Sequence, residues 1–508
     1  MKISCLTFTR VNCLMTAFLA STFSGAIAGT LRFDQFYADN AVLQREVVLP
    51  VSGSADPGAS VTIDFAGSSA CAKADAKGRW RVQLPAKSAG GPYVLKATTG
   101  TETVAATNVF VGEVWLVSGQ SNAYYPLERF KSKTQEWLKD ADYPLVRFLE
   151  ISWQQPHDRH HDLWQTVSPA TAAKCSATGF FFAKNLQRDL KIPVGIIVAA
   201  VDGSIIQSWL SPEAYAKVHG SDEALEKQHQ AEKLWRDYWA EIERRKKLSA
   251  EELKTLGELV RPEYPARYFS GHYHTFIEPI IPFPLKGVIW YQGESNGMFS
   301  QGYIYRFFLR EMIRDWRGRW NAELPFLVVQ LPHWKHSRLW ADIRESQLIV
   351  AAAEPGVYIV PTFDIGDMKD IHPPKKPELG ERLSAFARRF VYGDKSVKAE
   401  GPIFESAEQQ GKELLVRFRV NAPLASRDGQ MLRGFEVAGA DGKYRRATVR
   451  IVDEKTLAVS EPTIAAPAFV KYGWDTPDEV NFFDADGRVA GAFASKLGGF
   501  IPPKTKRR

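Results

Sequence analysis

A serine at the end of an apolar run is the first residue in this sequence with a clear chemical use. Ser121 lies in the polar stretch 118–122, directly after the apolar run 114–117. A turn at the end of a buried strand lifts a serine Oγ above the sheet, and backbone N–H groups of the same turn can hold an oxyanion. Polar turns also end many strands without any catalytic role, so this motif alone leaves both interpretations open.

Three later polar clusters supply the groups that a serine nucleophile needs. They are 202–204 after the run 194–198, 292–296 after the run 288–291, and 364–373, which contains His372, after the run 357–360. The carboxyl ends of parallel strands meet at one rim of a sheet, so these clusters are expected beside Ser121. An imidazole with an aspartate neighbour provides the base and its orienting partner. The sequence therefore predicts a serine hydrolase.

The elements that must position these groups fall into three parts. Residues 29–108 alternate short apolar runs with turn clusters, which predicts an N-terminal β-sandwich. From 109 to 395 apolar runs alternate with amphipathic stretches, which predicts an α/β domain with a parallel sheet covered by helices on both faces. Residues 396–508 return to short β-like runs and predict a second β-sandwich-like domain.

A charged insertion at 212–268 interrupts the α/β part. Apolar residues recur every four positions from Leu234 to Ile242, which predicts one apolar helix face. Ser249 followed by Glu252 is typical of a capping box at the start of a second helix. We expect a helical pair packed on the core, and a role in walling one side of the cleft stays open.

The first 28 residues have the layout of a secretory signal peptide. Lys2 and Arg10 precede the apolar run 11–23, and the small residues of 26–28 form a cleavage site. No later run reaches the length of a membrane helix. The sequence thus predicts an exported protein, periplasmic or extracellular, without stable membrane insertion.

Composition and charge narrow the remaining classes. The chain has 508 residues, 45% hydrophobic and 24% charged, which is typical of a soluble globular protein. Its formal charge of +7 is spread thinly, apart from a few basic residues at the very end. Nucleic-acid binding is therefore disfavoured.

No metal or cofactor site is expected. His157, His160 and His161 are close together, but neither cysteines nor a His-Glu-x-x-His spacing accompanies them. A solvated loop is the better interpretation of this cluster. The chain also lacks a Gly-x-x-x-x-Gly-Lys phosphate-binding loop.

Taken together, the motifs resemble those of the sialate O-acetylesterase family in the SGNH/GDSL hydrolase superfamily. The matching stretches are 112–115 leading into 119–122, then 286–296 and 370–373, with secondary matches at 42–45, Trp340 and 344–347. The resemblance covers nearly the whole mature chain, flanking β-domains included. It implies an SGNH-type three-layer α/β/α hydrolase domain that removes O-acetyl groups from sugars.

The resemblance also implies roles for individual residues. Ser121 would attack the ester carbonyl, with His372 as general base and then general acid. The oxyanion hole would consist of the N–H groups of Ser121 and Gly203 and a side-chain amide from Gln292 or Asn296. Gln292 is preferred because it stands immediately at the strand end.

Three aspartates are candidates for orienting the imidazole of His372. The superfamily usually shows Asp-x-x-His, whereas Asp370 precedes His372 by two residues. Asp367 and Asp364 are also near in sequence. Asp370 is preferred, and the alternative that it merely caps the following turn stays open.

Substrate contacts are expected from Gln120 and Asn122, beside the nucleophile, and from Arg344. Arg344 would meet a sialic-acid carboxylate, although a structural ion pair is an equal alternative for it. Glu294 is expected to hold its loop by hydrogen bonds.

Two substrate classes fit, namely O-acetylated sialic acids and acetylated plant polysaccharides such as xylan or xyloglucan. The alternative from another class is a non-catalytic carbohydrate-binding protein, against which Ser121, His372 and an adjacent aspartate argue together.

Overall fold

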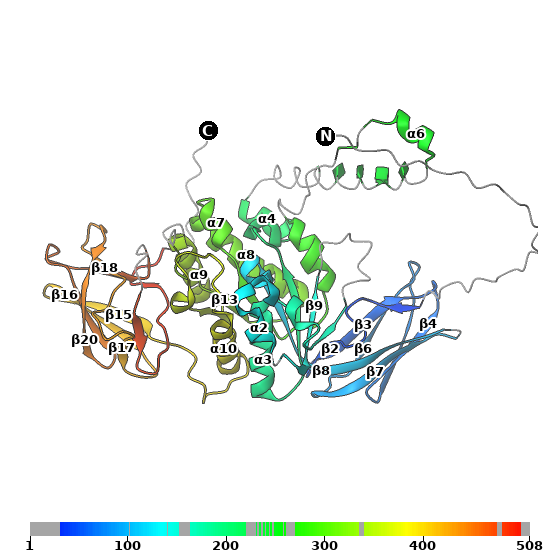
Figure 1. Ribbon diagram of the computed structural model, residues 1–508, viewed down its shortest axis with the longest axis horizontal. Helices are drawn as coiled ribbons and strands as arrows, with labels where there is room; N and C mark the ends of the chain where they lie inside the picture. Colours follow the sequence, from blue (N-terminus) through cyan, green and yellow to red (C-terminus); the bar gives the residue numbers. More distant parts are fainter. Residues whose placement is uncertain are drawn as a thin grey trace, which may run out of the picture.

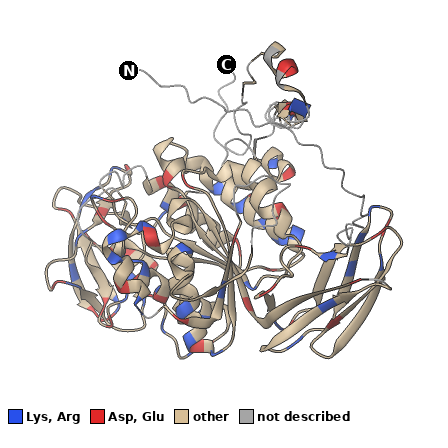
Figure 2. Cartoon of the chain, turned by 45° about the vertical axis from the view of Figure 1, so that its right-hand side comes forward, with Lys and Arg blue, Asp and Glu red and all other residues tan. Residues whose placement is uncertain are grey.

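The computed structural model describes residues 31–100, 102–139, 141–151, 163–219, 270–334, 340–474 and 480–498, with further positions between 230 and 260. The predicted signal peptide at 1–28 and the histidine cluster at 157–161 lie outside the described residues. None of the described helices has the length and apolar character needed to cross a membrane. Basic and acidic residues are interspersed over the described elements (Figure 2).

The N-terminal part consists of two facing sheets. One contains β1 (Arg32–Phe33), β3 (Leu49–Ser54) and β6 (Arg79–Leu84), and the other β4 (Ser60–Phe65), β5 (Ser68–Lys73), β7 (Gly90–Thr98) and the first half of β8 (Thr103–Gly119). Along β6, exposed and buried residues alternate strictly, with Trp80, Val82 and Leu84 turned inward. This period of two is what a half-buried strand requires.

The long strand β8 belongs to two structural units at once. Its first half pairs with β7 in antiparallel fashion, and its second half pairs in parallel with β11 (Val194–Ala200) and β12 (Gly287–Tyr291). From Val109 onward every residue of β8 is buried. The boundary that the sequence suggests at residue 108 therefore falls inside a strand, and the two units share one hydrophobic core.

The central sheet has the strand order β10-β9-β11-β8-β12-β13-β14. The elements not yet introduced are β9 (Tyr143–Glu150), β10 (Gln165–Val167), β13 (Phe326–Val329) and β14 (Val357–Val360). All the strand pairs from β9 to β14 are parallel, and β10 is antiparallel. Because β11 lies on one side of β8 and β12 on the other, the chain reverses direction across the sheet there. Such a switch point opens a crevice at the carboxyl ends of the strands.

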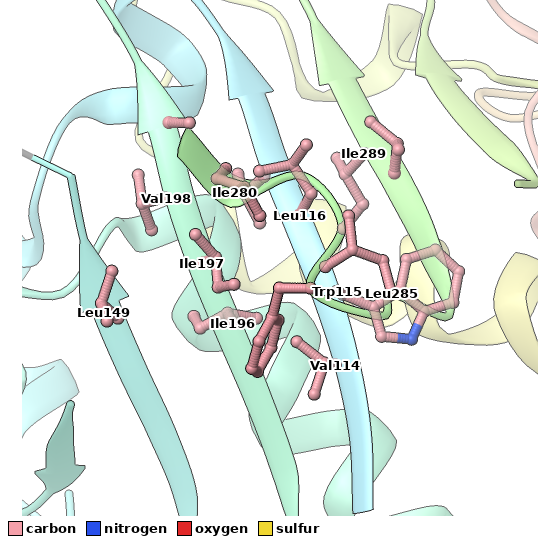
Figure 3. Close-up of a cluster of buried hydrophobic side chains, with 14 of the residues drawn as sticks. Val114, Trp115, Leu116, Leu149, Ile196, Ile197, Val198, Ile280, Leu285 and Ile289 are labelled. Atoms are coloured by element: carbon pink, nitrogen blue, oxygen red, sulfur yellow. The ribbon is translucent and has the colours of Figure 1, made fainter. Parts of the chain in front are cut away.

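The middle of this sheet is a buried apolar layer. Figure 3 shows Val114, Trp115 and Leu116 of β8 beside Ile196, Ile197 and Val198 of β11 and Ile289 of β12. Near-continuous apolar strands are typical of a parallel sheet that is covered on both faces.

Two helix pairs provide the cover. They are α3 (Ala177–Leu190) with α10 (Lys376–Phe386), and α8 (Gly302–Trp320) with α9 (Ala341–Ala353) (Figure 1). Trp115 packs on Phe182 of α3, with ring centroids 5.0 Å apart, and Trp290 packs on Trp316 of α8 at 5.9 Å. Trp290 is the register partner of Ser118, so both lie on one face of the sheet. Side chains alternate along β8, so this face is opposite to that of Trp115. The pairs thus cover opposite faces, and the predicted α/β class is confirmed.

The stretches 42–45 and 112–115, which match motifs of the resembled family, meet at the amino ends of the parallel strands. The strand β2 (Val42–Gln44) pairs in parallel with β8. Gln44 donates from Nε2 to Glu113 at 3.0 Å and accepts from the Val114 N–H at 2.8 Å, and Arg45 pairs with the buried Glu113 carboxylate. These motif residues hold β8 in place and lie away from the carboxyl ends of the strands.

The C-terminal part is β-rich and has a core of its own. One sheet has the order β15-β16-β21-β20, a second has the order β19-β18-β22-β24, and β17 pairs with β23. Their bounds are β15 (Ile403–Gln410), β16 (Glu413–Arg419), β17 (Leu424–Ser426), β18 (Phe435–Ala438), β19 (Arg445–Arg446), β20 (Thr448–Asp453), β21 (Thr456–Ser460), β22 (Phe469–Tyr472), β23 (Phe482–Asp484) and β24 (Phe493–Ala494). Aromatic rings such as Phe418, Phe435 and Phe482 fill this core.

The insertion at 212–268 begins with α4 (Pro212–His219), which packs on α8. The capping box at Ser249 and Glu252 starts α6 (Ala250–Thr255), as predicted. Leu234 is 59% exposed, so this position of the predicted apolar face is not packed on the core.

Candidate active site

Ser121 stands at the carboxyl end of β8, beside the switch point of the sheet. The strand ends at Gly119, and the short helix α1 (Ser121–Tyr124) begins two residues later. Gly119 has a φ of +133°, and a Cβ there would lie 2.1 Å from the carbonyl oxygen of Tyr291. Only glycine permits β8 and β12 to approach this closely at the point where the turn begins.

The nucleophile candidate and the base candidate are in contact. His372 lies in the segment between β14 and α10, and its Nε2 is 2.9 Å from the Oγ of Ser121, although 251 residues separate them. The ring of Tyr125 packs against the imidazole, with centroids 4.6 Å apart. This is the hydrogen-bonded arrangement that a serine needs in order to lose its proton to a base.

The surroundings of His372 favour the neutral, proton-accepting form of its imidazole. Burial lowers the pKa of His372 below 6.5, and the nearby ammonium of Lys376 lowers it further. The carboxylates of Asp370 and Asp202 act in the opposite direction but do not prevail. A histidine with a lowered pKa can accept the serine proton without first losing one of its own.

Of the three candidate aspartates, Asp370 is the one that faces the imidazole. Its Oδ1 lies 3.7 Å from Nδ1 of His372 and accepts a 2.8 Å hydrogen bond from the backbone N–H of the same residue. Asp364 is paired with Arg382 at 2.8 Å, and Asp367 accepts from the backbone of Lys369. The distance of 3.7 Å makes the contact electrostatic rather than a hydrogen bond.

Two backbone N–H groups are available for an oxyanion. The N–H groups of Ser121 and Gly203 donate no hydrogen bond to any other residue that the structure describes. Gly203 has a φ of +69°, with open space where a Cβ would stand, and Ser204 donates to the carbonyl of Gly119 at 3.3 Å. This hydrogen bond holds the turn at Gly203 against the turn that carries Ser121.

The side-chain amides expected in the oxyanion hole point elsewhere. Gln292 is fully buried and donates from Nε2 to the carbonyl of Ser204 at 3.0 Å and to Oδ1 of Asn296 at 2.8 Å. Asn296 donates to Gln207 and Gln301 at 2.8 and 2.9 Å. Both amides have found acceptors inside the protein, so the structure differs here from the expectation. They brace the ends of β11 and β12 instead.

Gln120 is also turned inward, although it was expected to contact substrate. Its Oε1 accepts from the Nε2 of Gln292 at 3.2 Å and from the N–H of Ser295 at 3.3 Å, and the residue is 3% exposed. Its Nε2 has no acceptor among the described residues. Gln120 therefore carries a free amide donor next to Ser121, a role for which Gln292 was the preferred candidate.

Asn122 does not face substrate either. It is 1% exposed, its Nδ2 donates to Glu294 at 2.8 Å and to the carbonyl of Ile371 at 3.1 Å, and its Oδ1 accepts from Nζ of Lys376 at 2.7 Å. Glu294 thus holds its loop by hydrogen bonds, as predicted. Lys376 was not singled out in the sequence, where its position four residues after His372 was the available signal.

Arg344 lies in the interface between the α/β part and the C-terminal part. It is fully buried and donates to the carbonyls of Leu331 at 3.2 Å and Gly473 at 2.5 Å. It cannot meet a substrate carboxylate there, which corrects the expectation.

Arg129, exposed on the 3-10 turn η1 (Leu127–Arg129), lies 4.9 Å over the ring of Tyr125, which itself packs on His372.

Among the residues that the structure describes, no group of three or more histidine, cysteine, aspartate or glutamate side chains is arranged to hold a metal ion.

Nearly the whole chain is similar to known carbohydrate esterases. The crystal structure of a carbohydrate acetylesterase from Xanthomonas citri is 32% identical in sequence, with 92% of this chain and 100% of that chain covered and a TM-score of 0.78. The chain belongs to the sialate O-acetylesterase family of carbohydrate esterases. The family model for carbohydrate esterases described as sialic acid-specific acetylesterases matches residues 273–388, which include Gln292 and His372.

Members of the sialate O-acetylesterase family are also found among mammalian proteins. The sialate O-acetylesterase of Mus musculus is 26% identical over 495 residues, 88% of this chain and 90% of its own length. That of Homo sapiens is 25% identical over 429 residues, 74% of each. Family membership supports an ester hydrolase that removes acetyl groups from sugars, rather than a non-catalytic carbohydrate-binding protein.

Proposed function

We propose that this protein removes O-acetyl groups from sugars by a serine-nucleophile mechanism of the SGNH type. The observation that carries the proposal is the 2.9 Å contact between Ser121 Oγ and His372 Nε2 at the carboxyl end of β8. The neutral imidazole takes the hydroxyl proton as the serine oxygen attacks the acetyl carbonyl. A tetrahedral intermediate then forms, with its negative charge on the former carbonyl oxygen.

The intermediate is stabilised by donors near the serine that have no other partner among the described residues. The N–H groups of Ser121 and Gly203 are free for the oxyanion, and Nε2 of Gln120 is the side-chain amide that can join them. Donors that are in place before the reaction lower the barrier because they need no reorganisation. His372 then gives its proton to the sugar oxygen, and the deacetylated sugar leaves.

The second half of the reaction releases acetate. The acetyl group is now esterified to Ser121, and His372 takes a proton from a water molecule that attacks the acetyl carbonyl. The oxygen of Ser121 leaves with the proton from His372, which restores the free enzyme. In both halves the imidazolium is stabilised by the carboxylates of Asp370 and Asp202, each of which favours its charged form.

For the substrate we favour O-acetylated sialic acids, with acetylated xylan or xyloglucan as the alternative. Relatives named for sialate esters align over most of the chain. Arg129 supplies an exposed cation near His372, which suits a sugar that carries a carboxylate. The predicted signal peptide at 1–28 supports export to the periplasm or beyond, where such glycans are met.

A first experiment tests the mechanism. The hydrolysis of p-nitrophenyl acetate is measured for the wild type and for Ser121→Ala, His372→Ala and Ser69→Ala, the last an exposed serine on β5. We expect both active-site variants to lose roughly a thousandfold or more in kcat, because nucleophile and base act as a unit, while Ser69→Ala keeps wild-type turnover. Full turnover by Ser121→Ala would refute the mechanism.

A second experiment tests the substrate. Acetate release is compared between O-acetylated sialic acid and acetylated xylan or xyloglucan oligosaccharides under the same conditions. A higher kcat/KM on sialic acid is expected, and a clear preference for the neutral oligosaccharides would select the alternative.

A further inference from the structure

A buried lysine lies behind the catalytic serine, and the proposed reaction makes no direct use of it. Lys376 is the first residue of α10, yet it is 1% exposed. Its ammonium lies over the rings of Tyr291 at 5.3 Å and Phe130 at 5.6 Å. Taking an ammonium out of water is strongly unfavourable unless its hydrogens find partners. Among the described residues its Nζ donates to one side chain, that of Asn122, whose Oδ1 lies 2.7 Å away.

The carboxamide of Asn122 connects this lysine to both halves of the catalytic pair. Asn122 directly follows Ser121, and its Nδ2 donates to the carbonyl of Ile371, the residue before His372, at 3.1 Å. The same Nδ2 donates to the buried carboxylate of Glu294 at 2.8 Å. One side chain therefore joins the turn of the nucleophile, the segment of the base and the loop after β12.

The carboxamide of Asn122 has two orientations, which exchange its Oδ1 and Nδ2. Only one of them forms hydrogen bonds with all the neighbouring groups. If the side chain of Asn122 turned over, its Oδ1 would face the carbonyl of Ile371 and the carboxylate of Glu294, and none of the three can donate. A group that can only donate, placed beside Oδ1 of Asn122, also excludes the turned-over orientation, because Nδ2 would then face another donor. Lys376 is such a group in its charged form, which prevails below its pKa of about 7.

We propose that Lys376 is a positioning residue, which by donating to Asn122 fixes the segment of His372 against the turn of Ser121. The inference rests on the proposed function, because it makes Lys376 responsible for the distance between the nucleophile Ser121 and its base His372. A displacement of about 1 Å between such groups can cost roughly 100-fold in rate.

The charge of Lys376 has a second effect that a purely structural residue would not have. Among the residues that the structure describes, four charged groups act on the imidazole. Lys376 of α10 and Arg129 of η1 lower the pKa of His372, while Asp370 and Asp202 raise it. Lys376 itself faces Glu294 and Asp370, and burial lowers its own pKa to about 7. Removing the ammonium therefore raises the pKa of His372, so the imidazole becomes protonated, and activity is lost, at a higher pH.

The test uses Lys376→Met and Lys376→Gln, with Lys375→Met as the matched control. Lys375 is the neighbouring lysine, is exposed, and donates to the carbonyl of Asp364 at 3.0 Å. With p-nitrophenyl acetate as substrate, kcat, KM and the pH dependence of kcat/KM are measured. For both Lys376 variants we expect kcat to fall roughly 10- to 100-fold, KM to stay within about twofold, and the acidic limb to move to higher pH. The control should match the wild type.

The outcomes separate this inference from the proposed function. Full turnover by Ser121→Ala would refute the proposed serine-nucleophile mechanism. If Ser121→Ala is inactive while the Lys376 variants keep wild-type kcat or an unmoved acidic limb, the positioning role alone is refuted. Thermal melting shows whether Lys376→Met folds. If it does not, Lys376→Gln decides, since its uncharged amide is polar but can accept from a turned-over Asn122 as well as donate to it.

Discussion

Tyr125 lays its ring against the imidazole of His372, with centroids 4.6 Å apart and planes inclined by 48°, while its hydroxyl donates to Asp202 at 2.9 Å. The phenol thus connects the helix that carries Ser121 with the turn that carries Gly203. Its packing against the imidazole of His372 also limits how far that ring can rotate. Tyr125 was not recognised in the sequence, where it is one of two adjacent tyrosines after the serine.

Replacing Tyr125 separates these two roles. In Tyr125→Ala the imidazole loses its packing, and we expect kcat/KM for p-nitrophenyl acetate to fall roughly tenfold. Tyr125→Phe keeps the ring and loses only the hydrogen bond to Asp202, so it should recover most of the lost activity. Equal losses in the two variants would show that the hydroxyl, and not the ring, matters.

Changing Asp370 tests its contact with His372. The carboxylate raises the pKa of His372, so Asp370→Asn should lower that pKa further and move the acidic limb of the pH profile of kcat/KM to lower pH. Because the side chain is 57% exposed and 3.7 Å from Nδ1, we expect a loss of roughly tenfold in kcat, well below that of a buried, hydrogen-bonded aspartate.

Asp367→Asn is the control for this measurement. Asp367 accepts from backbone N–H groups of the same segment and has no contact with the imidazole among those the structure describes. Its pH profile should therefore be that of the wild type. A larger loss for Asp367→Asn than for Asp370→Asn would reassign the orienting carboxylate.

The substrate preference is expected to depend on Arg129. If the sugar carries a carboxylate, Arg129→Gln should raise KM for O-acetylated sialic acid roughly tenfold and leave KM for acetylated xylan oligosaccharides unchanged. An equal rise in KM for the acidic and the neutral substrate would mean that Arg129 does not bind the substrate carboxylate. Steady-state kinetics on the two substrates make the comparison.

Arg344 should matter for stability rather than for substrate binding. Arg344→Met leaves the buried carbonyls of Leu331 and Gly473 without their donor, and we expect the free energy of unfolding to fall by about 2–5 kcal/mol. The ratio of KM values for acidic and neutral substrates should be unchanged. Denaturant unfolding measures the first quantity, and a normal midpoint combined with an altered KM ratio would contradict the assignment.

The sequence by itself determined the strands and what stands at their ends. Continuous apolar runs such as 114–117 and 288–291 can only be buried on both faces, so the sheet and the polar residues at its carboxyl rim follow from local composition. For this reason the sequence already predicts that Ser121, Gly203 and His372 lie at this rim. The aspartate preferred in the sequence is also the one that faces the imidazole.

The tertiary structure decided what each polar side chain does at that rim. An amide or guanidinium forms hydrogen bonds with whatever packing brings within about 3 Å, and residues distant in sequence determine this. Gln292 and Asn122 therefore turned inward, and Arg344 became an interdomain residue. The boundary at 108 fell inside β8 because one strand pairs with two different sheets. Lys376 acquired its partner only when α10 packed behind the serine, since local sequence holds no information about which side chain a buried ammonium will meet.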